Sequence, residues 1–166
     1  MKRLFIIRHA KSDHGPQYQS DFERPLNQRG RKDARRMSLE LKKATGHLDH
    51  LLVSSAKRTS QTAEYFMETF GIDPSSVTYT RSLYLPYEKD IWNEVGKIRN
   101  SHEVIAVFTH NPAAEELLHR YHPENKLPTC SIIEFRYEGE NWKDISPETV
   151  RFITYKYPKM YDTEED

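Results

Sequence analysis

The chain has 166 residues, and 25 Lys and Arg residues balance 25 Asp and Glu residues, so the formal net charge is zero. This balance provides no overall field that would attract nucleic acid or an anionic membrane. A single cysteine, Cys130, excludes an intrachain disulfide, and no stretch approaches the roughly 20 apolar residues of a membrane-spanning helix. We therefore expect one soluble, cytoplasmic domain over residues 1–160, followed by an acidic tail over 161–166.

The first predicted element is a strand over 4–7, an unbroken apolar run of the length that suits a strand buried on both faces. It ends at Arg8 and His9. Ligands of open parallel sheets bind outside the carboxyl ends of the strands, so this pair suggests a site for an anion next to a nucleophile. On their own, the two residues are explained more simply as a surface cation and a polar residue that closes the strand.

Strand and helix patterns alternate along the rest of the chain. After a polar loop over 11–25, helices are predicted from an Asn27 cap to Gly46, from a Ser54-Ser55 cap to 70, around 91–98, and from Pro112 to about 121. Further strands are predicted over 50–54, 77–81, 104–109, 131–137 and 151–157. This alternation predicts an α/β fold, a three-layer α/β/α sandwich with a mostly parallel sheet and an antiparallel edge.

Two more strand ends carry a cation or an imidazole. Arg58 lies in the first turn of the helix after strand 50–54, where a cation opposes the helix dipole unless an anion lies between them. His110 directly follows the buried run 104–109. Each residue alone is explained by a solvated helix position or a structural strand end, but three such junctions at one sheet edge favour a binding site.

Three motifs together resemble those of the histidine phosphatase superfamily: Arg8-His9-Ala10, the run 54–63, and Thr109-His110-Asn111-Pro112. The residues at 11–12, the stretch 21–26 and Arg29-Gly30 are similar to its small branch, the SixA-type phosphohistidine phosphatases. The resemblance covers roughly residues 3 to 137. It implies a phosphoglycerate mutase-like fold and a cytoplasmic hydrolase that needs no metal or other cofactor.

The same resemblance implies a role for individual residues. His9 would be the nucleophile that forms a phosphohistidine intermediate, and the phosphoryl group would be bound by Arg8, Arg58, His110, Asn111 and Ser12. Fixed guanidinium groups suit this task because phosphoryl transfer spreads negative charge over three oxygens. The implied partner is a protein phosphorylated on histidine, or a phosphorylated small molecule, and neither nucleic acid nor a membrane.

Many members of the superfamily carry an acid after the third strand, where it protonates the leaving oxygen. The corresponding stretch here, 81–87, has no carboxylate, and Glu88 and Asp90 fall where acids complement the start of a helix. A phosphohistidine substrate is affected less, because imidazole titrates near pH 6.5 and can take a proton from water. We therefore expect a P–N substrate, with specificity set by the loop 11–25 and by 84–90.

Two other functions stay open at this stage. One is a small-molecule phosphatase of the same superfamily, and the other is a phosphate-binding module with little catalytic activity. The basic run 29–36 is interpreted as a solvated helix face, because its charges mostly lie opposite Ala34, Met37 and Leu41.

Overall fold

A computed structural model describes residues 1–162 of the chain. Its strands are β1 (Lys2–Arg8), β2 (His50–Ser54), β3 (Val77–Thr80), β4 (Val104–Thr109), β5 (Ile132–Tyr137) and β6 (Val150–Lys156). Its α-helices are α1 (Gln28–Thr45), α2 (Lys57–Phe70), α3 (Glu88–Gly96) and α4 (Ala113–His119). Single 3-10 turns are η1 (Asp21–Glu23), η2 (Pro74–Ser76), η3 (Arg81–Leu83), η4 (Trp142–Asp144) and η5 (Pro158–Tyr161).

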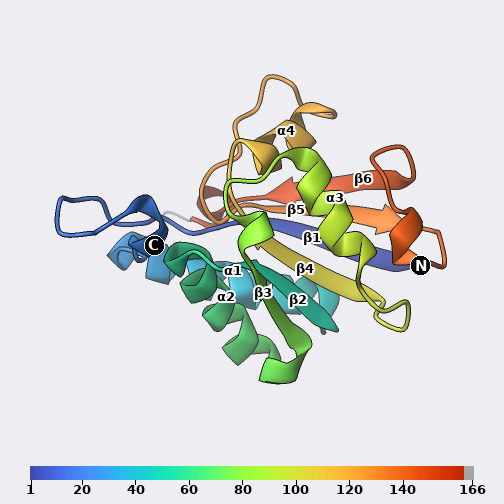
Figure 1. Ribbon diagram of the computed structural model, residues 1–166, viewed down its shortest axis with the longest axis horizontal. Coiled ribbons are helices and arrows are strands. Elements are labelled where there is room, and N and C mark those ends of the chain that lie inside the picture. Colours follow the sequence, from blue (N-terminus) through green and yellow to red (C-terminus); the bar gives the residue numbers. More distant parts are fainter. Residues whose placement is uncertain (163–166) are drawn as a thin grey trace.

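Within residues 1–162, six strands form one sheet in the order β3-β2-β4-β1-β5-β6 (Figure 1). β1 runs parallel to β4, and β2 runs parallel to both β4 and β3. β5 is antiparallel to β1, and β6 is antiparallel to β5. The predicted mostly parallel sheet with an antiparallel edge is confirmed, and the carboxyl ends of β1, β2 and β4 meet at one edge of it.

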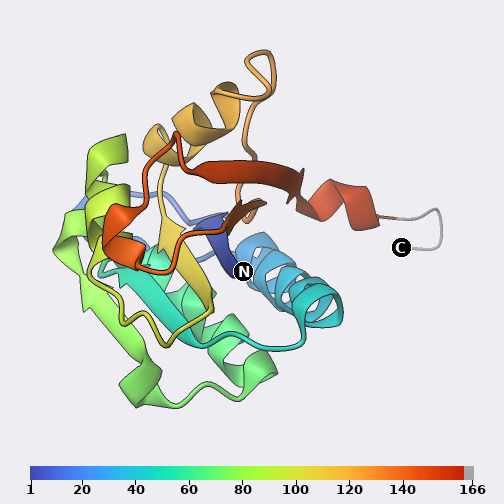
Figure 2. The same cartoon turned by 90° about the vertical axis from the view of Figure 1, so that its right-hand side faces the viewer.

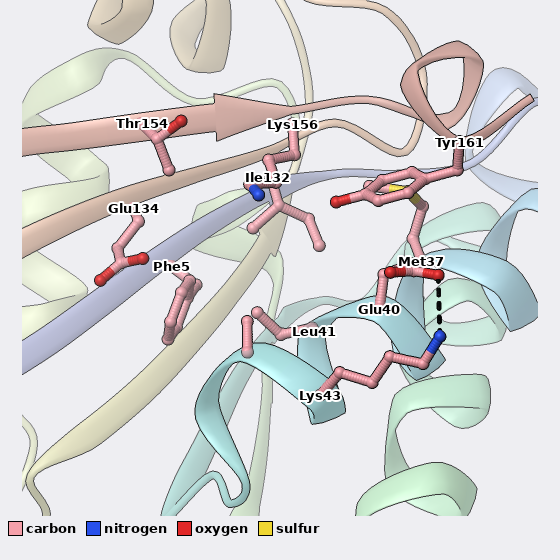
Figure 3. A pocket seen from close by; sticks show the side chains of 11 residues that line it. Phe5, Met37, Glu40, Leu41, Lys43, Ile132, Glu134, Thr154, Lys156 and Tyr161 are labelled. Atoms are coloured by element: carbon pink, nitrogen blue, oxygen red, sulfur yellow. Dashed lines mark hydrogen bonds and ion pairs between the residues drawn. The ribbon is translucent and has the colours of Figure 1, made fainter.

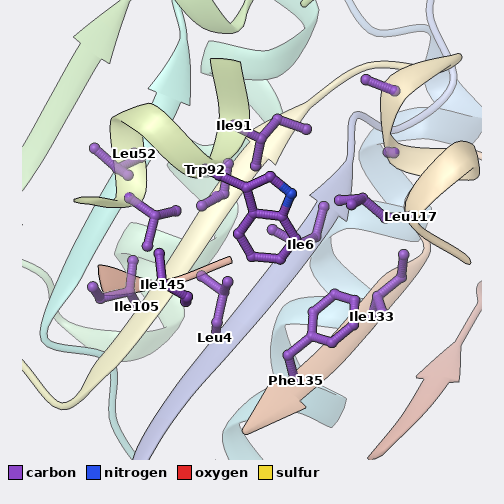
Figure 4. Close-up of a cluster of buried hydrophobic side chains, with 14 of the residues drawn as sticks. Leu4, Ile6, Leu52, Ile91, Trp92, Ile105, Leu117, Ile133, Phe135 and Ile145 are labelled. Carbon is purple, nitrogen blue, oxygen red and sulfur yellow. The ribbon is translucent and has the colours of Figure 1, made fainter. Parts of the chain in front are cut away.

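Helices cover both faces of the sheet, which confirms the three-layer arrangement: α1 and α2 lie on one face, α3 and α4 on the other (Figures 1 and 2). The alternation of side chains along β1 explains the two cores. Phe5 and Ile7 pack in the cluster that includes α1 and α2. Leu4 and Ile6 point the opposite way, into the cluster around Trp92 of α3 (Figure 4).

The helix boundaries confirm some predictions and correct others. The Asn27 side chain accepts a hydrogen bond from the backbone N–H of Gly30, and Gly46 follows the last residue of α1, as predicted. The predicted Ser54-Ser55 cap of α2 is wrong. Ser54 closes β2, the N-cap is Ala56, and no side chain caps the helix.

The later helices differ from the predictions at their ends. Pro112 is the N-cap of α4 and not its first residue, and the helix ends at His119. Helix α3 ends at Gly96, so Ile98 packs against the core from the loop beyond it. None of the helices within residues 1–162 combines the length and the apolar composition that crossing a membrane requires.

After β6 the chain turns back onto α1 through η5, and the side chains of Arg36 and Asp162 lie 3.6 Å apart there. A cavity of about 230 Å³ remains between α1 and the β5–β6 pair, with Phe5, Met37 and Ile132 in its apolar wall and Tyr161 at one side (Figure 3). The predicted tail over 161–166 falls mostly outside the described residues, which end at 162.

The loop that follows His9 is fixed to the start of α1. The backbone N–H of Asn27 donates to the carbonyl oxygen of Lys11 at 3.0 Å. Gly30 packs so closely against the same carbonyl that a Cβ atom at position 30 would overlap it. The absence of a side chain at Gly30 therefore lets the helix approach the segment that carries His9.

Replacement of Gly30 by alanine should destabilise the protein, although alanine favours a helix more than glycine does. Because the overlap is with backbone, the cost should be about 1–3 kcal/mol in the free energy of unfolding, measured by urea denaturation. The matched control is Gln28→Ala, an exposed position in the same turn, which should change the value by less than about 0.5 kcal/mol. A Gly30→Ala protein as stable as the wild type would contradict this packing.

Candidate active site

The topology brings the predicted site residues to a single place. Arg8 at the end of β1 pairs with Thr109 at the end of β4, and β2 ends alongside β4. Arg58, from the first turn of α2, is buried beside them. All the residues predicted for the site line one cavity of about 420 Å³: Arg8, His9, Ser12, Arg58, His110 and Asn111.

His9 is buried, and one hydrogen bond fixes its tautomer. Its Nδ1 lies 2.7 Å from the carbonyl oxygen of Ala10, which can only accept, so Nδ1 carries the proton. The Nε2 atom is then unprotonated, and it accepts a hydrogen bond from Nε of Arg58 at 3.3 Å. Burial, followed by the nearby charges of His110, Arg58 and Arg8, lowers the pKa of His9 well below 6.5. His9 is thus a neutral imidazole with its lone pair in the cavity.

His110 is almost completely buried, with its ring centroid 5.2 Å from that of His9. Its Nε2 lies 2.8 Å from the hydroxyl oxygen of Ser54, whereas its Nδ1 has no hydrogen-bond partner among the described residues. Burial, and then the charge of Arg58, lowers the pKa of His110 to about 3. A buried polar atom without a partner is costly unless a ligand binds it, so Nδ1 of His110 is a candidate contact for an anion.

Arg8, like His110, has one side-chain nitrogen with a hydrogen-bond partner and another without one among the described residues. Its Nη1 donates to the carbonyl oxygen of Leu127 at 2.9 Å, but its buried Nε has no partner among the described residues. Asn111 also donates to Leu127, from Nδ2 at 3.2 Å, and its buried Oδ1 is unpaired in the described structure. The carbonyl of Leu127 thus holds two side chains of the cavity wall, while the Nε–H of Arg8 is left without a partner among the described residues.

Arg58 is bound to Asp21, which the loop 11–25 brings over the cavity. Nη1 of Arg58 donates to the backbone oxygen of Asp21 at 2.7 Å, and Nη2 donates to its carboxylate at 2.9 Å. Tyr84 and Arg24 donate to the same carboxylate at 2.6 Å and 2.7 Å. Burial raises the pKa of Asp21, but the hydrogen bonds from Tyr84, Arg24 and Arg58 outweigh it and hold the pKa far below 3.8.

Sequence reasoning missed four residues of this arrangement: Ser54, Asp21, Arg24 and Tyr84. Asp21 and Arg24 lie in the stretch 21–26, whose resemblance to the SixA-type branch was the one available signal for them. Residues of the loop 11–25 and Leu85, which belong to the two segments expected to set specificity, do line the cavity. Ser12, a predicted residue, accepts a hydrogen bond from Nη1 of Arg24 at 2.7 Å.

The two acids considered from the sequence lie outside the cavity lining. Glu88 accepts a hydrogen bond from Nε of Arg120 at 2.9 Å, and Asp90 accepts one from the backbone N–H of Tyr87 at 2.8 Å. Asp21 is the only carboxylate among the described residues that line the cavity, and it is ionised and held by cations. No three His, Cys, Asp or Glu side chains within residues 1–162 are grouped closely enough to hold a metal ion.

These atoms suit an oxyanion that is bonded or about to be bonded to His9. A neutral imidazole lone pair faces a hollow with guanidinium groups of two arginines and the unpaired Nδ1 of His110 around it. Guanidinium groups match the oxygens of a phosphoryl group, and fixed donors of this kind stabilise developing negative charge.

Comparisons with known proteins relate the chain to a family and to a fold. Residues 4–82 match the family model of the histidine phosphatase superfamily (branch 1). An uncharacterized protein of Mycobacterium tuberculosis is 26% identical over 165 residues, which span 92% of this chain and 100% of the relative.

Solved structures show the fold more completely. The SixA protein of Agrobacterium tumefaciens superposes with a TM-score of 0.77 at 23% identity, over 95% of this chain and 98% of that one. The protein histidine phosphatase SixA in complex with tungstate gives a TM-score of 0.76 at 23% identity, over 96% and 99% of the two chains. The first half of the chain thus matches branch 1 of the histidine phosphatase superfamily, and the chain as a whole shares the phosphoglycerate mutase-like fold of the SixA structures.

Proposed function

We propose that this protein is a phosphatase that hydrolyses its substrate through a covalent intermediate on Nε2 of His9. One observation carries the proposal. The unprotonated Nε2 of a buried, neutral histidine faces a cavity in which the buried Nε of Arg8 and Nδ1 of His110 lack partners among the described residues. A bound phosphoryl group would satisfy both of these atoms.

In the first step, Nε2 of His9 attacks phosphorus, a new P–N bond forms, and the bond to the leaving group breaks. Arg8, Arg58 and His110 stabilise the charge on the equatorial oxygens, while the carbonyl of Ala10 stabilises the imidazole ring as it becomes positive. In the second step, water attacks the phosphohistidine. The P–N bond breaks, inorganic phosphate leaves, and His9 returns to its neutral state.

The protonation state of Asp21 favours a phosphohistidine substrate. An alkoxide leaving group needs an acid within hydrogen-bond reach. Asp21 remains ionised at working pH, and Glu88 and Asp90 are outside the cavity lining. An imidazole leaving group needs this acid less, because its own basicity lets it take a proton from water. We therefore infer that the substrate carries its phosphoryl group on nitrogen, most simply a histidine side chain of a protein.

Phosphoenzyme trapping with a substrate panel tests the proposed function. Rapid mixing with a 32P-labelled phosphodonor should label wild-type protein in an acid-labile, alkali-stable form, and His9→Ala should give no label. Under identical conditions, kcat/KM should be much higher for a phosphohistidine protein than for aryl phosphate, sugar phosphates or nucleotides. EDTA should leave these rates unchanged, because the arginines and His110 supply the charge stabilisation.

The other functions give different outcomes in the same experiment. Faster turnover of a sugar phosphate or nucleotide would identify a small-molecule phosphatase. Phosphate binding without any labelled protein from any donor would identify a binding module and would contradict the covalent mechanism.

The lowered pKa values of His9 and His110 predict that neither ring gains a proton near pH 6.5. A base with a lowered pKa takes up its proton only at lower pH, so both rings should stay neutral from pH 7.5 to 5.5. In the unfolded chain both histidines take up a proton below about pH 6.5, whereas in the folded protein they stay neutral. The free energy of unfolding should therefore decrease as the pH falls below about 6.5. Ring 15N shifts, assigned with His9→Ala and His110→Ala, provide the measurement. A midpoint near 6.5 for either ring would contradict the assignment.

Ser54 should position His110. Ser54→Ala removes the partner of Nε2 and leaves a buried polar atom unpaired, which should lower kcat by about tenfold at a cost near 1.4 kcal/mol. Ser55→Ala, one residue further along and just beyond the end of β2, should keep wild-type kcat, because the Ser55 side chain makes no hydrogen bond to His110. The 15N shifts of His110 should change in Ser54→Ala only. Unchanged kcat and unchanged His110 shifts in Ser54→Ala would remove Ser54 from the mechanism.

A further inference from the structure

A second cavity, of about 510 Å³, adjoins the active-site cavity and shares two lining residues with it, Lys11 and Thr129. Its lining also includes the start of α1, with Arg29, and the segment after β6, with Tyr157 and Lys159. We call this second cavity the Lys11 groove. A ligand that extends from His9 past Lys11 would enter it.

The groove is basic although the whole chain has no net charge. Lys11, Arg29 and Lys159 are exposed along it. Its one lining carboxylate among the described residues, Asp33, is buried, and both its oxygens accept from Nε of Arg29 at 3.1 Å. The ion pair with Asp33 offsets the charge of Arg29, so two lysines remain to attract an anionic ligand.

The charges at the start of α1 point to an anion as well. The first turn of this helix contains Arg29 and Arg31 and no acidic residue, and of these two cations Arg29 lines the groove. Cations are unfavourable at the positive end of a helix dipole, whereas an anion bound near them relieves the repulsion. The basic run that the sequence suggested was a solvated face thus begins at the wall of a cavity next to the active site.

The position of Lys11 between the two cavities is fixed through its backbone. Its carbonyl accepts from the N–H of Asn27, and Gly30 packs against it. Tyr157 and Pro158 provide an apolar wall on the far side. A groove with exposed cations and an apolar wall suits an extended acidic peptide, whose backbone contacts the wall and whose carboxylates face the lysines.

We propose that the Lys11 groove binds an acidic segment of the substrate protein that flanks the phosphohistidine. This inference rests on the proposed function, and it names the substrate class more closely: proteins with Asp or Glu next to the phosphorylated histidine.

Peptide binding tests the proposal without requiring turnover. Two peptides carry the non-hydrolysable analogue phosphoryltriazolylalanine, one flanked on both sides by Asp and Glu and the other by Asn and Gln. The wild-type protein should bind the acidic peptide roughly tenfold more tightly at low salt, as expected for a few exposed ion pairs, and less selectively at high salt. Lys159→Glu should abolish the preference.

Lys143→Glu is the matched control, because it makes the same charge change at an exposed residue of η4, outside the groove lining, and should keep the wild-type preference. Equal wild-type affinity for the two peptides, or an unchanged preference in Lys159→Glu, would overturn the groove assignment. Hydrolysis of authentic phosphohistidine peptide is measured separately. Its absence would count against the proposed function, while the binding preference would still decide the groove.

Discussion

The hydrogen bond from Nδ1 of His9 to the carbonyl of Ala10 is the constraint on which the rest of the site depends. It leaves Nε2 without a proton, and burial beside Arg8, Arg58 and His110 keeps the ring neutral. The same three side chains would stabilise the negative charge of a phosphoryl group, so one set of residues both prepares the nucleophile and receives the group it attacks. The pairing of β1 with β4 and the packing of Gly30 against Lys11 hold this geometry in place.

Asp21 connects the electrostatics of the site to the choice of substrate. A carboxylate over a phosphate site would repel the ligand if it were isolated, but three donors surround this one and Arg58 is shared between it and the cavity. The carboxylate therefore orients Arg58 and holds the loop 11–25 over the cavity. Because it is ionised, it has no proton to give to a leaving group. A site without a proton donor favours a leaving group that needs no acid, such as imidazole. The groove proposed beyond Lys11 would add a preference for acidic residues next to the phosphohistidine.

Much of the fold and of the site could be predicted from the sequence because the information was local. Buried apolar runs marked β1, β2 and β4, and parallel strands in one sheet must bring Arg8, His9 and His110 to the same edge. Contacts between distant segments left no such signal. The Ser54 hydroxyl bonds His110, 56 residues away, instead of capping α2, and Asp21 meets Tyr84 across 63 residues. Periodicity and capping rules describe neighbours in the chain, so they could not reveal either contact.

A crystal structure with vanadate or tungstate bound would show whether these side chains converge on one oxyanion at His9. We expect the oxyanion on Nε2 of His9, with its oxygens bonded to Nε of Arg8, the guanidinium of Arg58 and Nδ1 of His110. An oxyanion seated away from His9, or seated on it with Arg58 and His110 both out of hydrogen-bond reach, would rule out the proposed site.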